Sequence, residues 1–566
     1  MTGPVELMAA VSLLALMIVL KFVNVTRYRF DSDEPQHMHV IWAWARGFVQ
    51  YRDVFDNHMP LFHIMFAPIF GLIGDRASIL CWMRYILLPM YFVGAWCTYR
   101  IGELLFSRRA GIWAVILVGL YPSYHSTSFE FRPDNLLAPL WLLCITTLLR
   151  GPLTLARALI SGLLLGLCFS VSMKSVLLFP VLLASAAIAL LLVSKEQSSL
   201  LPTSWMCVGA GLLVALLPPA AVALAFRGVW RDFYYCNFEH DVIPHVDAKT
   251  YAAWWIVIFA LVLGLAIYLA RIIVRAAPGS VIAFRRGFIF LACGVYLLVL
   301  HSFYVLILHT PWYRVPRQNY LPFFPLGFVL VSGGLLAISP HLEKYSPHNN
   351  HYLRRLSLPA FIALVELTLL IITRPPWING ARLETNLLRS VLKVTDPGDW
   401  VLDCKGETIF RQRSFWPVTE RVTLQRLALG LMTDNGPERA VETRTCVAVM
   451  EDRMPRRTRK FIWENYVPVG DGLRVAGRVL KPSRKNGGRI GFEVVIPARY
   501  KIVAREGSVT GTLDGMAYDG DRARFLAPGK HTFAPTSSRK ELAFLWAQAV
   551  DRNFLPEEFS HPSGKQ

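Results

Sequence analysis

The sequence predicts an α-helical polytopic membrane protein with a soluble domain at its C-terminal end. Hydrophobic residues make up 54% of the 566 residues and charged residues only 17%. Soluble chains are roughly 45–50% apolar and about a quarter charged. Long apolar runs recur up to about residue 373, and a bilayer core requires about 20 apolar residues per helix. This composition excludes an ordinary soluble enzyme, a coiled coil and a disordered chain.

About eleven apolar runs are candidate membrane-spanning helices by length. They are residues 5–24, 78–99, 110–128, 134–149, 158–173, 175–193, 204–225, 253–270, 287–308, 321–338 and 356–373. The first run has no basic n-region and no A-x-A cleavage site, which favours a retained helix over a signal peptide.

The apolar run Pro60–Gly74 is about 15 residues long, which is short for a membrane span and typical of an interfacial helix. If this run does not cross, most acidic residues of the membrane half lie on one side, and the other side receives short basic loops. The predicted acidic side comprises 25–77, 129–133, 173–175, 226–252, 309–320 and everything after 374. Short basic loops are expected in the cytoplasm, so the acidic side is predicted to be outside.

The sequence changes character at about Arg374, and three domains are predicted: 1–373, 374–484 and 485–566. The membrane domain ends where Pro-Pro-Trp begins. In the second domain, alternating strands and helices predict an α/β fold. They are strands Trp400–Asp403, Thr445–Met450 and Leu473–Leu480 and helices Leu424–Met432 and Arg456–Tyr466. The third domain contains hairpin turns at Asp514-Gly515 and Pro528-Gly529, which predict a small β-sandwich.

The net charge of +20 is divided evenly, with about +10 on each side of residue 374. An even distribution favours an anionic membrane surface or lipid over nucleic acid, so no nucleic-acid partner is predicted. The nine cysteines show no zinc-ligand spacing. Cys404 and Cys446 fall on neighbouring predicted strands and are candidates for a disulfide.

Three carboxylates in four residues, Asp31, Asp33 and Glu34, follow the first apolar run. One interpretation is a helix N-terminus, where acidic residues favour the helix dipole and Pro35 suits the first turn. The other is a functional site, because acidic residues clustered at membrane depth are usually functional.

The residues that follow resemble a known family. Gly47 to Leu61 contains G-x-x-x-Y-x-D, with Tyr51 and Asp53, and then H-x-P-L, beginning at His58. This order is similar to the first outer loop of the GT-C superfamily of polyprenyl-phosphate-sugar glycosyltransferases, in the branch that modifies lipid A and lipopolysaccharide cores and in protein O-mannosyltransferases. Further similar segments are 105–111, 130–135, 166–174, 314–325 and 397–402. The chain lacks a Trp-Trp-Asp signature, which argues against an oligosaccharyltransferase.

The resemblance implies a GT-C-like fold with two interfacial helices and transfer of a sugar from a polyprenyl-phosphate carrier to an outer-face acceptor: lipopolysaccharide or lipid A, a glycan or a protein. Inversion by single displacement is expected. Asp33 lies at the family's catalytic position, and Glu34 and Asp134 are the other catalytic candidates. Candidate substrate-binding residues are Asp31, Tyr51, Asp53, His58, Arg132, Lys174, Arg314, Arg317 and Tyr320. Cations are needed because the leaving group is a phosphate.

Alternatives stay open for several of these residues. One alternative is that Arg132 and Asp134 simply pair with each other. Another is that Lys174 extends from a helix end toward water. No cofactor is established; Glu34, His58 and His240 are candidate ligands of a divalent cation.

The predicted localisation is a bacterial inner membrane, with the active site on the periplasmic face. The rival functions are a polytopic transporter and an envelope-polysaccharide assembly or binding protein without catalysis.

Overall fold

The computed structural model describes residues 4–192, 205–243, 252–277, 280–308, 314–345, 357–480, 489–536 and 541–560. The chain divides into two compact units, which are described separately. Unit 1 comprises Met1–Arg29, Asn57–Met65 and Cys81–Gly380, and unit 2 comprises Phe30–Asp56, Phe66–Leu80 and Ala381–Gln566.

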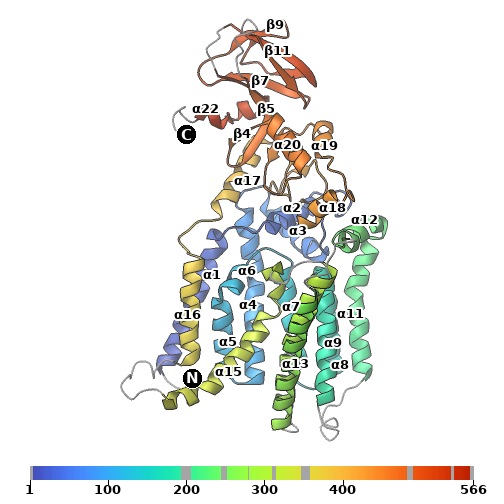
Figure 1. The fold of residues 1–566 in the computed structure, drawn as a ribbon, viewed down its shortest axis with the longest axis vertical. Helices are drawn as coiled ribbons and strands as arrows, with labels where there is room; N and C mark the ends of the chain where they lie inside the picture. Colours follow the sequence, from blue (N-terminus) through green and yellow to red (C-terminus); the bar gives the residue numbers. More distant parts are fainter. Residues whose placement is uncertain are drawn as a thin grey trace. The chain divides into compact units, whose positions relative to one another are not determined.

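Unit 1 is helical, and its long helices run side by side in Figure 1. They are α1 (Pro4–Arg27), α4 (Ile79–Leu105), α5 (Arg108–Leu120), α6 (Pro122–Thr127), α7 (Asp134–Leu149), α8 (Leu155–Val171), η1 (Met173–Leu177), α9 (Leu178–Leu192), α11 (Trp205–Ala225), η2 (Arg227–Val229), α12 (Trp230–Tyr234), η3 (Tyr235–Glu239), α13 (Ala252–Ala276), α14 (Val281–Ser302), η4 (Phe303–Ile307), η6 (Arg317–Tyr320), α15 (Phe324–Tyr345) and α16 (Leu358–Thr373).

Within the described residues, seven helical segments are long and apolar enough to cross a membrane. They coincide with the predicted runs that begin at residues 5, 78, 175, 204, 253, 287 and 321. The other four predicted runs coincide with shorter helices: α5 with α6, then α7, α8 and α16. The prediction of a polytopic helical membrane protein is confirmed.

Polar contacts inside unit 1 agree with the predicted sides of the membrane. Asn57 donates a hydrogen bond of 3.1 Å to Asp241, and both belong to the predicted acidic side. Arg109, from a predicted basic loop, donates a 2.8 Å bond to Glu6, near the opposite end of α1 from the acidic segment.

Helices α8 and α11 pack closely because both carry glycine at the contact. A Cβ atom added to Gly162 would lie 2.0 Å from the carbonyl oxygen of Gly211, so no larger residue fits there. Small residues that let two backbones approach are typical of helix pairs in membranes.

A buried arginine fixes the C-terminal end of α1. The guanidinium of Arg84 donates to the carbonyl oxygens of Val25, Tyr28 and Arg29 at 3.1, 2.9 and 2.9 Å. These carbonyls have no partner within the helix, and a cation also favours the negative end of the helix dipole. Arg84 thereby fixes the point where the chain leaves α1 toward Asp31.

Unit 2 combines helices with two sheets. Its helices are α2 (Asp33–Ala45), α17 (Arg382–Val394), α18 (Arg421–Ala428), α19 (Gly436–Glu442), α20 (Arg456–Asn465), α21 (Ala547–Asp551) and α22 (Glu557–Ser560). Its strands are β1 (Trp400–Leu402), β2 (Gln412–Arg413), β3 (Val447–Val449), β4 (Tyr466–Gly470), β5 (Leu473–Leu480), β6 (Ile490–Val494), β7 (Ala498–Ala504), β8 (Thr510–Leu513), β9 (Met516–Asp519), β10 (Arg524–Leu526), β11 (Gly529–Pro535) and β12 (Leu542–Trp546).

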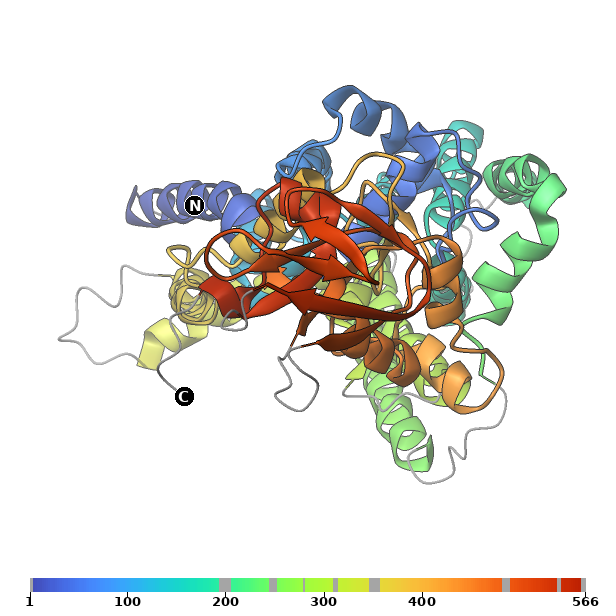
Figure 2. The same cartoon turned by 90° about the horizontal axis from the view of Figure 1, so that it is seen from above.

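The larger sheet has the strand order β10-β7-β12-β5-β3-β1-β2, with β4 also paired to β5. Strand β1 runs parallel to β2 and β3, whereas the other pairs are antiparallel. The smaller sheet, β6-β11-β8-β9, appears among the red strands in Figure 2. The predicted turn at Asp514-Gly515 joins β8 to β9, and both residues have positive φ, 50° and 80°, as a tight hairpin turn requires.

The larger sheet contains strands from both sides of residue 485, and one hydrophobic core extends over both regions. The division into domains 374–484 and 485–566 stays a prediction. Cys404 and Cys446 are both buried and both free, so the candidate disulfide is not formed.

Helix α3 (Leu61–Ile73) corresponds to the short run Pro60–Gly74. Residues Phe30–Asp56 before it and the residues up to Leu80 after it belong to unit 2, and Arg46, before α3, lies 3.2 Å from Asp75, after it. A helix that crossed a bilayer would separate these residues by about 30 Å. The structure therefore agrees with the predicted non-crossing helix.

Labelling of single cysteines with a membrane-impermeant reagent tests this topology. We expect Ser78→Cys and Gly398→Cys to react from the same side of the membrane, and Ala156→Cys, at the start of α8, from the opposite side. Reaction of Ser78→Cys and Gly398→Cys from opposite sides would contradict the non-crossing helix.

Candidate functional site

The acidic segment begins helix α2, and its three carboxylates have different partners. The backbone N–H of Asp31 donates to Glu34 Oε1 at 2.9 Å, and that of Asp33 donates to Asp31 Oδ1 at 3.1 Å. Glu34 is completely buried. Asp31 and Glu34 thus organise the start of the helix, as one sequence interpretation predicted.

Asp33 forms an ion pair with Lys405, which lies 372 residues away in the chain. The Lys405 side chain is only 2% exposed, and its ammonium also lies 3.8 Å from Glu420. Burial alone would lower the pKa of Lys405, but the charges of Asp33 and Glu420 outweigh it, so the pKa lies above its ordinary value. Lys405 therefore stays protonated and holds a full positive charge beside Asp33. Lys405 is not among the site residues predicted from the sequence.

The loop that carries Lys405 is fixed by a second buried ion pair. Arg413 Nε donates to Asp403 Oδ1 at 2.6 Å, and Arg413 Nη2 donates to the carbonyl oxygen of Cys404 at 2.7 Å. Asp403 also accepts from the hydroxyl of Thr408 at 2.7 Å. Burial would raise the pKa of Asp403, but the Arg413 charge outweighs it and holds this pKa below its ordinary value. The loop is thus rigidly tied on both sides of Lys405.

Helix α2 packs on the same loop through His39. Its Nδ1 donates to the carbonyl oxygen of Ile409 at 2.8 Å. Burial, and then the Arg413 charge, lower the pKa of His39 to about 4, so the ring is neutral at physiological pH. Gly406 has a φ of +90°, and a Cβ there would lie 2.7 Å from His39 Cβ. Ile409 has a φ of 47°, which is strained for a β-branched residue. The positive φ angles of Gly406 and Ile409 thus accompany the close contact between this loop and α2.

In unit 1, the structure brings together four predicted site residues. Lys174 Nζ lies 2.8 Å from Asp134 Oδ1, and Arg132 Nε lies 3.5 Å from Asp134 Oδ2. His58 is close enough to interact electrostatically with Asp134. Arg132 and Asp134 are buried, whereas the Lys174 side chain is 31% exposed. We call Arg132, Asp134, Lys174 and His58 the cation cluster. Arg132 and Asp134 lie close together as the internal-pair alternative predicted, and the Lys174 ammonium ends on the buried Asp134 carboxylate.

Polar side chains near the end of α14 accompany the cation cluster. Tyr304 interacts electrostatically with Asp134 and Arg132, and its hydroxyl accepts a 2.7 Å hydrogen bond from Asn319. The predicted residue Tyr320 is bonded to His301 Nε2 at 2.9 Å. Tyr304, Asn319 and His301 were not identified from the sequence, because each is a single polar residue beside an apolar run.

Other predicted residues have local roles or different surroundings. Tyr51 is buried with a φ of 76°, and Asp53 forms a 2.8 Å pair with its neighbour Arg52. Arg317, the first residue of η6, is exposed, and so is Arg314, three residues before it. His240, which follows η3, is completely buried in unit 1.

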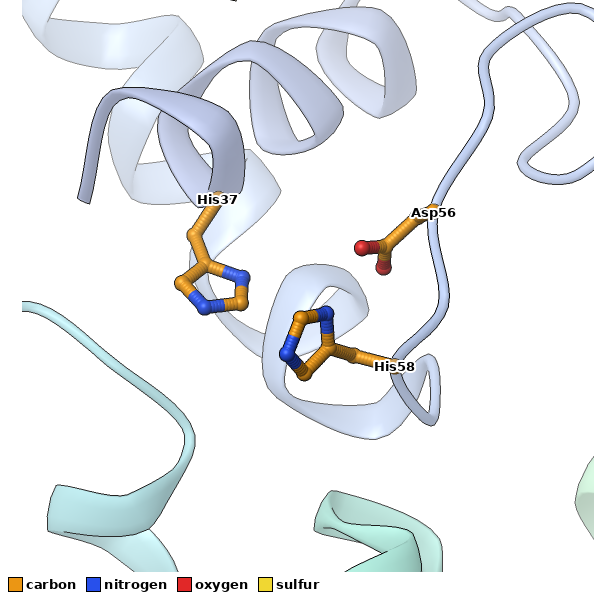
Figure 3. Close-up of side chains that lie close together, drawn as sticks. All are labelled: His37, Asp56 and His58. Atoms are coloured by element: carbon orange, nitrogen blue, oxygen red, sulfur yellow. The ribbon is translucent and has the colours of Figure 1, made fainter. Parts of the chain in front are cut away.

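The best-placed ligands for a divalent cation in unit 2 are His37 and Asp56, whose ligand atoms lie within 4.8 Å of each other (Figure 3). Asp56 is completely buried and accepts hydrogen bonds from Gln36 at 3.2 Å and Gln50 at 2.8 Å. His58, a predicted ligand, follows Asp56 by two residues. A buried carboxylate with imidazole nitrogen fits the donors that Zn²⁺ prefers.

Comparison with known proteins supports the predicted resemblance. Residues 57–223 match the family described as dolichyl-phosphate-mannose-protein mannosyltransferase. This segment contains all four residues of the cation cluster. No curated protein sequence matches the chain.

Two solved structures of one protein, ArnT, show the same fold at low sequence identity. ArnT from Cupriavidus metallidurans bound to undecaprenyl phosphate has a TM-score of 0.52 and 13% identity, covering 82% of this chain and 97% of that chain. The apo state of the same ArnT has a TM-score of 0.53 and 12% identity, covering 82% and 96%. An oligosaccharyltransferase from Archaeoglobus fulgidus in the apo form has a TM-score of 0.46 and 12% identity, covering 81% and 72%.

The chain is an integral membrane protein with the fold that the GT-C resemblance predicted. Its sequence is similar to the mannosyltransferase family over the matched segment, and its fold is similar to that of ArnT. Both findings agree with the prediction of a membrane glycosyltransferase.

Replacement of Lys405 tests the buried ion pair. We expect Lys405→Met to lower the free energy of unfolding by about 3–5 kcal/mol, because the substitution leaves Asp33 and Glu420 without their shared cation. Lys460→Met is the matched control, since Lys460 is 77% exposed and should change stability by less than about 0.5 kcal/mol. Thermal and urea unfolding of the purified protein in detergent measures both variants. Equal free energies of unfolding for Lys405→Met and Lys460→Met would contradict the ion pair between Lys405 and Asp33.

Proposed function

We propose that this chain is a glycosyltransferase that moves a sugar from a polyprenyl-phosphate carrier to an acceptor hydroxyl on the outer face of a bacterial inner membrane. The acceptor class proposed is an envelope lipid or glycan, such as lipopolysaccharide or lipid A, or a protein. The observation that carries this proposal is the buried cation cluster, which lies inside the segment similar to mannosyltransferases. ArnT, which has the same fold, was crystallised with undecaprenyl phosphate.

The cation cluster has side chains suited to a phosphate. Arg132 and Lys174 both contact the Asp134 carboxylate, so a guanidinium and an ammonium lie close together. A guanidinium presents a planar fork that suits phosphate oxygens, and an ammonium is a compact point charge. We propose that Asp134, a predicted catalytic residue, positions the two cations. Tyr304 and Tyr320 supply further hydroxyl groups nearby.

The proposed reaction is a single displacement with inversion. The acceptor oxygen attacks the anomeric carbon, the bond between that carbon and the phosphate oxygen breaks, and the polyprenyl phosphate leaves with the electron pair. The acceptor proton passes to the Asp33 carboxylate, which acts as the general base. Lys405 pairs with Asp33 in the structure, and Glu34 and Asp31 hold the helix start that positions Asp33.

In unit 2, His37 and Asp56 would supply an imidazole nitrogen and a carboxylate oxygen to a divalent cation. A bound cation would supply Lewis-acid chemistry.

Asp33→Asn tests the general base. Asparagine keeps the shape and a hydrogen-bonding oxygen but cannot take the proton, so we expect turnover to fall by about 10²–10⁴-fold. Asp31→Asn and Glu34→Gln are controls and should reduce turnover less. The measurement is sugar transfer by purified protein from a polyprenyl-phosphate sugar, with unfolding curves to establish that each variant is folded. Near-normal turnover of folded Asp33→Asn would exclude Asp33, and normal turnover of all three variants would favour a transporter or a glycan-binding protein.

Replacement of the cations tests the donor site. We expect Arg132→Gln and Lys174→Gln each to weaken donor use by at least about tenfold, because each loses a charge-assisted bond to phosphate. Donor use by Arg314→Gln and Arg317→Gln, which replace the two exposed candidates, is measured in the same assay. Arg227→Gln, in the exposed turn η2, is the matched control. Unchanged KM and kcat in all four candidate variants would show that the phosphate is bound elsewhere.

A further inference from the structure

Unit 2 contains a cleft whose lining includes no residue of the candidate site. Its volume is about 570 Å³, within the range typical of ligand pockets. Residues at the start of β1, on the neighbouring strands β7 and β10, and at the end of β12 line it. Aromatic and charged side chains dominate the lining: Trp400, Phe525, Trp546, Arg444, Arg499 and Asp551.

An exposed aromatic ring lies on the edge strand of this cleft. Strand β10 forms the edge of the larger sheet, and its Phe525 is directly opposite Arg499 of β7 in the antiparallel register. Phe525 is 58% exposed. Because directly opposed residues on antiparallel strands share one face, the ring and the guanidinium form a joint surface. A flat apolar ring beside a fork of donors suits a sugar, which has an apolar C–H face and polar hydroxyl edges.

Three of the five charged residues that line the cleft have close polar partners. Asp551 accepts a 2.6 Å bond from Lys501, and Arg552 donates a 2.7 Å bond to Asp396. The carboxylate of Asp399 accepts bonds from the Gln548 side chain at 2.9 Å and from the backbone N–H of Asp396 at 2.7 Å. The other two charged residues are arginines.

Arg444 and Arg499 differ from these paired groups. Within the part of the chain that the structure describes, neither forms an ion pair, and Arg499 has one long contact of 3.5 Å to a backbone carbonyl. Arg444 has a φ of 52° because it follows the C-cap of α19. Its N–H donates to the carbonyl oxygen of Val441 at 3.2 Å, and that of Thr445 donates to the carbonyl oxygen of Ala440 at 2.8 Å, which is the pattern of a Schellman motif. The cleft thus has two arginines available to an anion.

We propose that this cleft binds a saccharide that carries an anionic group, a carboxylate or a phosphate. Phe525 stacks on the apolar face of a sugar ring, and Arg444 and Arg499 bind the anion. The inference is independent of the proposed transfer reaction, because none of these residues belongs to the cation cluster or to the surroundings of Asp33.

Isothermal titration of the full chain in detergent tests the proposal with three probes: trigalacturonic acid, neutral maltotriose and inorganic phosphate. We expect trigalacturonic acid to bind at least tenfold more tightly than either of the others, because it alone offers both ring and charge. Arg444→Gln with Arg499→Gln should reduce its affinity at least tenfold, and so should Phe525→Ala. Arg489→Gln and Met516→Ala, both exposed residues of the smaller sheet region, are matched controls and should leave it unchanged.

Three results would overturn the proposal. They are no measurable binding of trigalacturonic acid, equal affinity in the cleft variants and the controls, and tighter binding of an acidic peptide, pentaglutamate, than of trigalacturonic acid. Asp33→Asn should bind trigalacturonic acid like the unmodified chain, which separates this proposal from the transfer reaction.

Discussion

The buried ammonium of Lys405 is the constraint on which unit 2 depends. It joins Asp33 at the start of α2 to Glu420 just before α18, and thereby ties the segment after the first helix to the C-terminal region. A buried ammonium is costly unless it is paired, so both carboxylates stabilise this conformation of the loop. The C-terminal region therefore supplies the counter-charge of the carboxylate proposed as the base.

Charge is balanced differently in unit 1. There Arg132 and Lys174 converge on the carboxylate of Asp134. Elsewhere in this unit a buried cation is stabilised by local dipoles, as Arg84 is by carbonyl groups near the end of α1. Because the cation cluster places a guanidinium and an ammonium together, it is the proposed phosphate site.

Features with a local signal in the sequence were predicted well. Apolar runs predicted the helices of unit 1, because length and composition alone determine them. Strand β5 was predicted with its observed bounds, and the Asp514-Gly515 turn was predicted because both residues tolerate positive φ. Long-range pairs were not predictable. Lys405 lies in a polar region without a motif, and its partner is 372 residues away. The proximity of His37 to Asp56 likewise depends on the fold of the loop after α2.

The central claim is that the chain transfers a sugar from a polyprenyl-phosphate carrier. The most direct measurement is release of free polyprenyl phosphate when purified protein is mixed with a polyprenyl-phosphate-linked sugar and extracted envelope lipids and glycans, followed by mass spectrometry of the products. The account predicts that release requires the acceptor extract and that one acceptor gains the mass of one sugar with inverted anomeric configuration. Donor that stays intact with every extract, in the presence of folded protein and added divalent cations, would contradict it.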